Sequence, residues 1–195
     1  MKIILFVLFV SFAACKGKPA PAPTPAAKAG DTTKFFQVKE YIEGQINAVN
    51  KTPYFIYKID VIDTRKDSVV IDNQQFSEIA KQFLQPDIND ASLRPFYTEN
   101  VFNDQTTKTY TLNYSTTNKD LPVQSIDVLL NENPQTVKRI FIRRFYNYGD
   151  SSAIEQLSWK PDESFQVNRL VQFGEEKEKS HQTTVVWNEG GNKKP

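Results

Sequence analysis

The chain has 195 residues, with 24 lysines and arginines against 23 aspartates and glutamates, one histidine and one cysteine. This near-neutral balance excludes the basic excess typical of nucleic-acid-binding proteins and argues against strong electrostatic steering of a charged partner. A single cysteine excludes an internal disulfide, and with a single histidine it excludes zinc and copper sites built from several nitrogen and sulfur ligands. We therefore expect a domain stabilised by its core, with no cofactor and no metal.

The first 14 residues are typical of an export signal. Lys2 supplies a positive charge, residues 3–12 form an apolar run interrupted only by Ser11, and Ala13 and Ala14 are the small residues that precede a cleavage site. The run has about half of the ~20 apolar residues that a membrane-spanning helix needs. These residues therefore predict a cleaved signal peptide.

The segment Phe12-Ala13-Ala14-Cys15 resembles the lipobox of bacterial lipoproteins, with Phe12 where that family usually has leucine. The resemblance implies that the Cys15 sulfur is lipidated, that cleavage occurs just before it, and that acyl chains such as palmitate hold the protein to a membrane. Several acyl chains anchor a protein far better than one, at ~0.8 kcal/mol per buried CH₂. The alternative is an ordinary signal peptide with an incidental cysteine nearby, or a buried free thiol.

Residues 16–30 are rich in proline, alanine and lysine and hold nothing that could anchor a core. Repeated Pro-Ala favours an extended polyproline II conformation, so residues 15–30 are expected to be a lipidated cysteine followed by a stalk. Surface-exported lipoproteins often carry acidic residues just after the cysteine, whereas Lys16 and Lys18 are basic. By that resemblance we expect the periplasmic face of the outer membrane. We predict one domain over residues 31–188 and a loose tail over 189–195.

Two helices are expected early in the domain. The first follows possible N-cap residues Asp31-Thr32-Thr33 and ends before Pro53, and the second follows Asp72, with Gln75 in the capping-box position. Apolar residues recur at helical spacing in both: Val38, Tyr41, Ile42, Ile46 and Val49 in the first, and Phe76, Ile79, Ala80, Phe83 and Leu84 in the second. Between them, residues 54–62 and 68–71 predict a β-hairpin.

Residues 87–105 are expected to be irregular, and the residues after them have the pattern typical of strands. Six strand-like runs cover residues 106–115, 123–130, 136–146, 152–159, 164–173 and 182–187. The connections between them are short, which requires antiparallel neighbours. The predicted fold class is α+β: two N-terminal helices with a hairpin, followed by a six-strand antiparallel meander forming one curved sheet or half-barrel. In architecture alone, this order resembles half-barrel periplasmic lipoprotein carriers, which implies an apolar cavity.

Residues 136–146 carry both apolar residues and arginines on both faces of the expected strand, unlike a strand with one solvated face. If the turn near Gly149 pairs Asn147 with Ser152, then Arg144 faces Glu155, and Ile140 and Ile142 face Trp159 and Leu157. The other face is predicted to gather a candidate ligand site of Arg139, Arg143, Arg169, Phe141, Phe145, Phe165 and Phe173, together with Ile154.

This candidate face has two interpretations. It is either an aromatic-lined concavity with guanidinium groups placed for a carboxylate or phosphate, or a half-covered sheet face whose arginines extend from its edge into water.

No residue is predicted to be catalytic. His181 is expected to be a solvated side chain beside a charged loop, and the aspartates around the hairpin lack the glycine and closing glutamate of a calcium loop. The leading hypothesis is a membrane-anchored periplasmic lipoprotein that binds an envelope protein or an amphiphile without catalysis. The alternative is a structural or assembly lipoprotein without a small-molecule ligand, and the third is a hydrolase with an unrecognised carboxylate site.

Overall fold

A computed structural model describes residues 35–132, 136–174, 176 and 178–188. All of them belong to the second of two compact units, which spans residues 34–195. The predictions for the signal peptide, Cys15, the stalk, the Asp31-Thr32-Thr33 cap and the tail lie outside the described residues. Within the described part, no helix is both long and apolar enough to cross a membrane.

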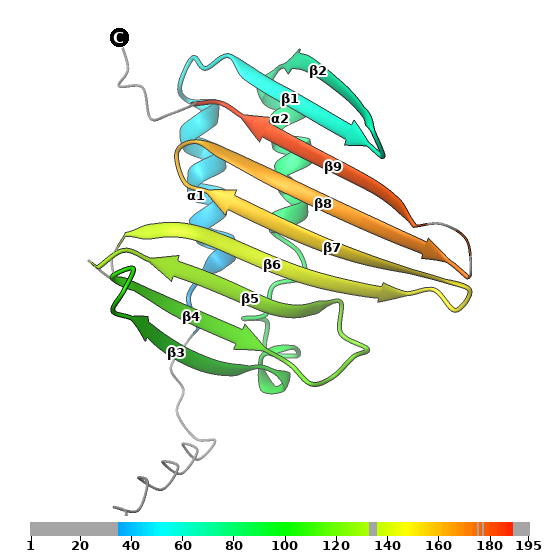
Figure 1. The fold of residues 1–195 in the computed structure, drawn as a ribbon. Coiled ribbons are helices and arrows are strands. Elements are labelled where there is room, and N and C mark those ends of the chain that lie inside the picture. The colour runs from blue at the N-terminus through cyan, green and yellow to red at the C-terminus, as the bar shows by residue number, and fades with distance from the viewer. Residues whose placement is uncertain (1–34, 133–135, 175, 177, 189–195) are drawn as a thin grey trace, which may run out of the picture. The chain divides into compact units, whose positions relative to one another are not determined.

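The described elements are two α-helices, two single-turn 3-10 helices and nine strands (Figure 1). They are, in chain order, α1 (Val38–Asn50), β1 (Ile56–Ile62), β2 (Arg65–Ile71), α2 (Asn73–Ala80), η1 (Lys81–Phe83), η2 (Arg94–Phe96), β3 (Thr98–Asp104), β4 (Thr109–Ser115), β5 (Val123–Leu130), β6 (Val137–Asn147), β7 (Ser151–Lys160), β8 (Ser164–Phe173) and β9 (Lys179–Val186).

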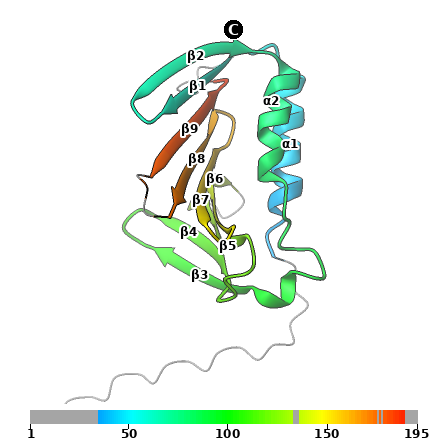
Figure 2. The same cartoon turned by 90° about the vertical axis from the view of Figure 1, so that its right-hand side faces the viewer.

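The nine strands form one antiparallel sheet with the order β2-β1-β9-β8-β7-β6-β5-β4-β3. From β3 to β9 each strand lies beside its neighbour in sequence. The early hairpin joins the sheet at its other end, because β1 pairs with β9, with Ile59 opposite Thr184. Both α-helices lie on the same side of the sheet (Figure 2). We call the side that carries them the helix face and the other side the open face.

The fold class predicted from the sequence is wrong. The structure is mainly one nine-stranded sheet, to which α1 and α2 contribute short helices of 13 and 8 residues. The segment expected to be irregular contains β3, whose residues are all exposed and therefore show no apolar alternation. The hairpin belongs to the same sheet because β1 pairs with a strand more than 100 residues later, and no local pattern indicates such a pairing.

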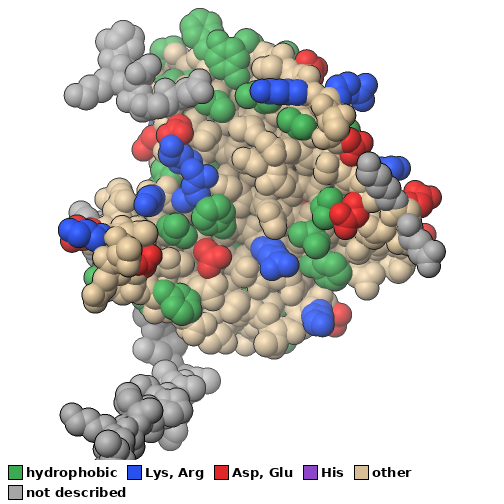
Figure 3. Space-filling view, in the orientation of Figure 1, with side chains coloured by type: hydrophobic (Ala, Val, Ile, Leu, Met, Phe, Trp, Pro, Cys, Tyr) green, Lys and Arg blue, Asp and Glu red, His purple; other side chains and the backbone are tan. Residues whose placement is uncertain are grey.

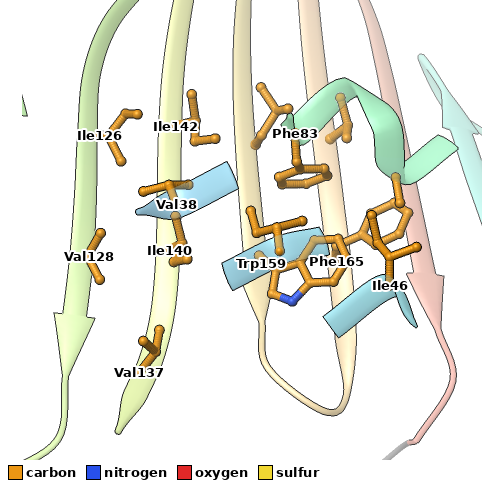
Figure 4. Packing of buried hydrophobic residues seen from close by; sticks show 14 of the residues in the cluster. Val38, Ile46, Phe83, Ile126, Val128, Val137, Ile140, Ile142, Trp159 and Phe165 are labelled. Atoms are coloured by element: carbon orange, nitrogen blue, oxygen red, sulfur yellow. The ribbon is translucent and has the colours of Figure 1, made fainter. Parts of the chain in front are cut away.

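Side chains fill the space between the helices and the sheet, so the apolar cavity implied by the half-barrel resemblance is replaced by a packed core (Figure 4). Trp159 and Phe165 stack with ring centroids 5.2 Å apart, and Phe83 meets the Trp159 ring edge-on at 5.1 Å. From α1, Ile42 and Ile46 are buried in the same cluster. Such aromatic pairs contribute about 0.5–1.5 kcal/mol each beyond their area burial.

The start of α2 confirms the predicted capping box. The Asp72 carboxylate accepts a hydrogen bond from the Gln75 backbone N–H at 2.7 Å, and the Gln75 side chain accepts one from the Asp72 N–H at 3.1 Å. These two bonds satisfy N–H groups that a helix start otherwise leaves unpaired. The predicted start of α1 differs, because that helix begins at Val38 and its N-cap residue, Gln37, makes no side-chain cap.

Candidate functional site

The middle of the open face shows few hydrophobic or charged side chains, and groups of both kinds are scattered around it (Figure 3). The pairing register of the strands explains why polar side chains lie together there. Neighbouring strands align residues of one face in rows across the sheet. One such row crosses seven strands from β3 to β9: Thr98, Ser115, Ser125, Arg143, Gln156, Asn168 and Gln182.

A hollow of about 340 Å³ lies over β6–β9 and the end of β1 on this face. This volume falls within the range of about 300–1,000 Å³ that is typical of ligand sites. Its lining, which we call the polar hollow, consists of Val61, Asp63, Arg143, Ile154, Gln156, Asn168, Arg169, Leu170, Ser180, His181 and Gln182.

Several polar groups of the hollow are free to bind a ligand. Within the described part of the chain, neither Arg143 nor Gln156 makes a side-chain hydrogen bond or ion pair. Asn168 uses only its side-chain oxygen, which accepts a bond from Gln166 at 2.8 Å, so its N–H₂ group remains a donor. Gln182 donates weakly to Thr184 at 3.4 Å and keeps its side-chain oxygen as an acceptor. The hollow thus offers a cation, donors and acceptors together.

The structure does not bring the seven predicted ligand-face residues together. Arg139, Phe141, Arg143 and Phe145 lie on the open face, but only Arg143 lines the hollow. Phe165, Arg169 and Phe173 follow the register of the helix face, although Arg169 also contributes to the lining. Phe165 is 1% exposed and belongs to the core. The aromatic-lined concavity predicted from the sequence is therefore absent from the described residues.

The turn between β7 and β8 determines which of the predicted residues lie on each face of the sheet. Lys160 pairs with Ser164, so Phe165 faces Trp159 and Arg169 faces Glu155, on the helix face. A shift of one residue in such a pairing exchanges the two faces of a strand. The turn includes Asp162 with a positive φ of 58°, a conformation that Asp adopts more readily than bulkier residues.

The register predicted for β6 and β7 is confirmed. Ile142 lies opposite Leu157, Ile140 opposite Trp159, and Arg144 opposite Glu155, with the arginine Nη1 3.7 Å from the carboxylate Oε2. The Arg169 Nη1 lies 3.7 Å from the other oxygen of Glu155. One carboxylate thus serves two arginines on the helix face, which leaves Arg143 as the open-face cation of the hollow.

The arginine beside Phe141 is engaged locally. The Arg139 guanidinium donates to Ser158 Oγ at 2.9 Å and lies 5.8 Å from the centroid of the Phe141 ring. Cation–π contacts of this kind contribute about 0.5–1 kcal/mol at exposed sites. Arg139 and Phe141 therefore stabilise the sheet surface next to the hollow.

His181, Asp60 and Thr183 come together on β1 and β9, a cluster that the sequence spacing did not indicate. The Thr183 hydroxyl donates to Asp60 Oδ1 at 2.7 Å, and His181 Nε2 lies 3.1 Å from the same oxygen. A nucleophilic relay requires the histidine to bind the carboxylate through one ring nitrogen and the hydroxyl through the other. Here Nε2 faces both groups, and the hydroxyl is already committed to the carboxylate, so this geometry forms no relay.

Three side chains donate to the Asp60 carboxylate: Lys58, Thr183 and His181. Burial raises its pKa, but hydrogen bonds from Lys58, Thr183 and His181 outweigh burial and lower the pKa below its ordinary value. Lys58 also forms an ion pair with it, at 2.7 Å. Asp60 is therefore a structural anion. Across the described residues, His, Cys, Asp and Glu side chains form no group of three that could hold a metal ion.

A larger hollow, of about 500 Å³, lies between α2 and the β1–β2 hairpin. Most of its polar groups are already engaged: Lys58 pairs with Asp60, Asp72 and Gln75 form the capping box, and Glu78 pairs with Lys81. The remaining lining includes Val69, Ile71, Gln74 and Ile79. Fewer free groups are available for recognition here than in the polar hollow, so we take the polar hollow as the candidate site.

The amides of the polar hollow were missed in the sequence, although a signal for them exists. Alternate positions of β8 read Gln166, Asn168, Leu170 and Gln172, and β9 continues with Gln182 and Thr184. This alternation marks a solvated face, but only the register across strands aligns Gln156, Asn168 and Gln182 beside Arg143.

Comparisons with protein-family models, with curated proteins and with solved structures find no match to this chain.

Proposed function

We propose that this chain is a lipid-anchored lipoprotein of the bacterial envelope whose sheet domain is a non-catalytic binding module. The lipobox-like segment that ends at Cys15 supports the anchor, and the basic residues that follow it favour the periplasmic face of the outer membrane. The open face of the sheet is the binding surface in this proposal.

One observation carries the proposal: the helices cover only one face of the sheet, and the uncovered face holds a hollow with an unpaired arginine. A guanidinium with no partner among the described residues is available for an anionic group of a ligand. The geometry favours a polar ligand over an amphiphile, because the apolar residues between helices and sheet are packed against one another.

Site-specific photo-crosslinking in intact cells tests this function. A photoreactive benzoylphenylalanine at position 156 samples the hollow, and the same residue at position 47 samples the exposed outer side of α1 as a matched control. We expect a defined adduct with an envelope component from position 156 and none from position 47. Equal adducts from both positions, or none from position 156, would contradict a binding role for the open face.

The exposed edge of the sheet favours a second candidate function, in assembly. Strand β3 pairs only with β4, all its residues are exposed, and Val101 and Phe102 are 60% and 59% exposed. An edge strand with exposed apolar side chains and without proline or lysine is a template for pairing with another chain. Phe102→Lys tests this candidate: it should reduce chemical crosslinking between copies in membranes, and unchanged crosslinking would reject it.

A further inference from the structure

Arg143 differs from the other arginines of β6 and β8 in having no partner among the described residues. Arg139 donates to Ser158, Arg144 and Arg169 lie near Glu155, and each of these contacts is internal to the sheet. The planar guanidinium presents two parallel N–H groups that match the two oxygens of a carboxylate. The hollow therefore contains a free group suited to one carboxylate.

Next to this cation, Gln156, Asn168 and Gln182 stand in register on three consecutive strands. Neighbouring strands lie about 4.8 Å apart, so the amides form a ladder across the floor of the hollow. An amide carries a donor and an acceptor in one plane. That combination suits a ligand with several hydroxyl groups, because each hydroxyl both donates and accepts.

The apolar part of the lining is aliphatic and small. Ile154 and Leu170 face each other across β7 and β8, and Val61 lies opposite Gln182. All three are half-buried. Aliphatic side chains can contact the C–H groups of a sugar ring. Nucleobases commonly stack on aromatic side chains, and the lining contains no aromatic residue other than His181.

We propose that the polar hollow binds a carboxylate-bearing saccharide, with Arg143 holding the carboxylate and the amide ladder holding the hydroxyls. The proposal rests on the proposed function, since it assigns a ligand class to the same open face. Among the charged groups of the lining, Arg143 is the cation available for an anion, because Arg169 lies near Glu155. Asp63 is itself a carboxylate and accepts a hydrogen bond from the Ser180 N–H at 3.2 Å.

Isothermal titration calorimetry of the full-length chain in detergent tests the ligand class. The probes are trigalacturonate and its carboxyl-reduced, neutral counterpart, which keeps the same linkages and ring stereochemistry. We expect the acidic trisaccharide to bind at least about tenfold more tightly, since a charge-assisted pair contributes more than a neutral hydrogen bond. Added salt should weaken the binding of the acidic trisaccharide and leave the binding of the neutral one unchanged.

Variants locate the site. Arg143→Gln should weaken trigalacturonate binding by about tenfold or more, and Asn168→Asp should weaken it similarly by placing a like charge in the ladder. Arg139→Gln is the matched control: it removes a guanidinium from the same strand and the same face but outside the hollow, so it should leave affinity unchanged. Thermal melting of each variant checks that the domain remains folded.

Equal affinity for the two trisaccharides, no binding of either, or unchanged binding by a folded Arg143→Gln variant would each overturn the proposal. Photo-crosslinking separates this failure from failure of the proposed function. If neither trisaccharide binds but position 156 still captures a protein, the open face is a binding surface and the ligand class is wrong. If position 156 also captures nothing, both proposals are rejected.

Discussion

Arg144 and Glu155 lie directly opposite each other on β6 and β7, with the guanidinium Nη1 3.7 Å from the carboxylate, and their side chains are only 5% and 12% exposed. The same arginine donates through Nη2 to the backbone oxygens of Gln82 and Gln85, both at 2.6 Å. These carbonyls lie in and after η1, so one buried guanidinium ties the segment that follows α2 to the middle of the sheet.

Replacement of Arg144 is expected to be strongly destabilising. Arg144→Met removes the donor from the Gln82 and Gln85 carbonyls and leaves Glu155 with the half-exposed Arg169 as its partner. Removal of one partner from a buried ion pair costs about 3–5 kcal/mol. Arg143→Met, one residue earlier on the open face, should change the free energy of unfolding by no more than about 0.5 kcal/mol. Urea unfolding followed by the fluorescence of the two tryptophans measures both, and similar losses in the two variants would contradict the assignment.

Arg169 should matter far less than Arg144. Its Nη1 also lies 3.7 Å from Glu155, but its side chain is 46% exposed, and water competes with the pair. Exposed ion pairs contribute about 0–1 kcal/mol. We therefore expect Arg169→Met to lower the free energy of unfolding by less than about 1 kcal/mol and Glu155→Leu to lower it more, because the latter leaves Arg144 buried without a carboxylate. The reverse order in urea unfolding would show that Arg169 is the main partner of Glu155.

Asp60 should contribute to acid sensitivity. Its pKa in the folded protein is lowered, since hydrogen bonds from Lys58, Thr183 and His181 outweigh the effect of burial, which raises it. A lowered folded-state pKa stabilises the fold at pH values above the ordinary pKa of 3.8, and this contribution is lost as the pH falls through the lower value. The stability difference between the wild type and Asp60→Asn should thus be largest near neutral pH and shrink below about pH 4.

Thermal melting at a series of pH values measures that difference. Asp120→Asn, which removes an exposed carboxylate from a loop, is the matched control for the loss of one negative charge. A difference between wild type and Asp60→Asn that stays constant from pH 7 to about pH 3 would contradict the role given to Asp60.

Tyr97 should stabilise the fold through its hydroxyl and should lose that effect in alkali. The buried hydroxyl donates to the backbone oxygen of Val123 at 2.7 Å, and burial raises its pKa to about 12. Tyr97→Phe removes this donor from the carbonyl and should cost about 1 kcal/mol at neutral pH.

Because the folded-state pKa is raised, the contribution of Tyr97 is fully present below the ordinary tyrosine pKa of 10 and declines as the pH rises towards 12. Urea unfolding at neutral pH and above pH 10 measures both effects. A Tyr97→Phe variant as stable as the wild type at neutral pH would show that the hydrogen bond contributes nothing.

Cys15 is expected to carry lipid. Mass spectrometry of the membrane fraction should find a chain that begins at residue 15 with lipid on its sulfur and an acyl group on its amine, and Cys15→Ser should abolish both the modification and membrane attachment. An unmodified Cys15 in the wild type would contradict the lipobox interpretation and favour the alternative of an ordinary signal peptide.

The sequence determined the local pairings of this protein. The turn near Gly149 is short, so β6 and β7 can pair in only a few registers, and the apolar pattern selects the one that places Arg144 opposite Glu155. The capping box at Asp72 and Gln75 is likewise local, because its two hydrogen bonds join residues three positions apart. Contacts of this range depend on neighbouring residues alone.

Only the tertiary structure decided how these local units combine. The β1–β2 hairpin joins β9 by pairing Ile59 with Thr184, and β3 extends the sheet although all its side chains are exposed. The local sequence of β1 and of β3 therefore does not indicate which strand each pairs with. The tertiary structure likewise decided which residues form the candidate site. The pairing of Lys160 with Ser164 places Phe165 and Arg169 on the helix face and aligns the open-face amides beside Arg143. Side chains alternate strictly between the two faces of a strand. The register across several strands therefore decides which residues share a face.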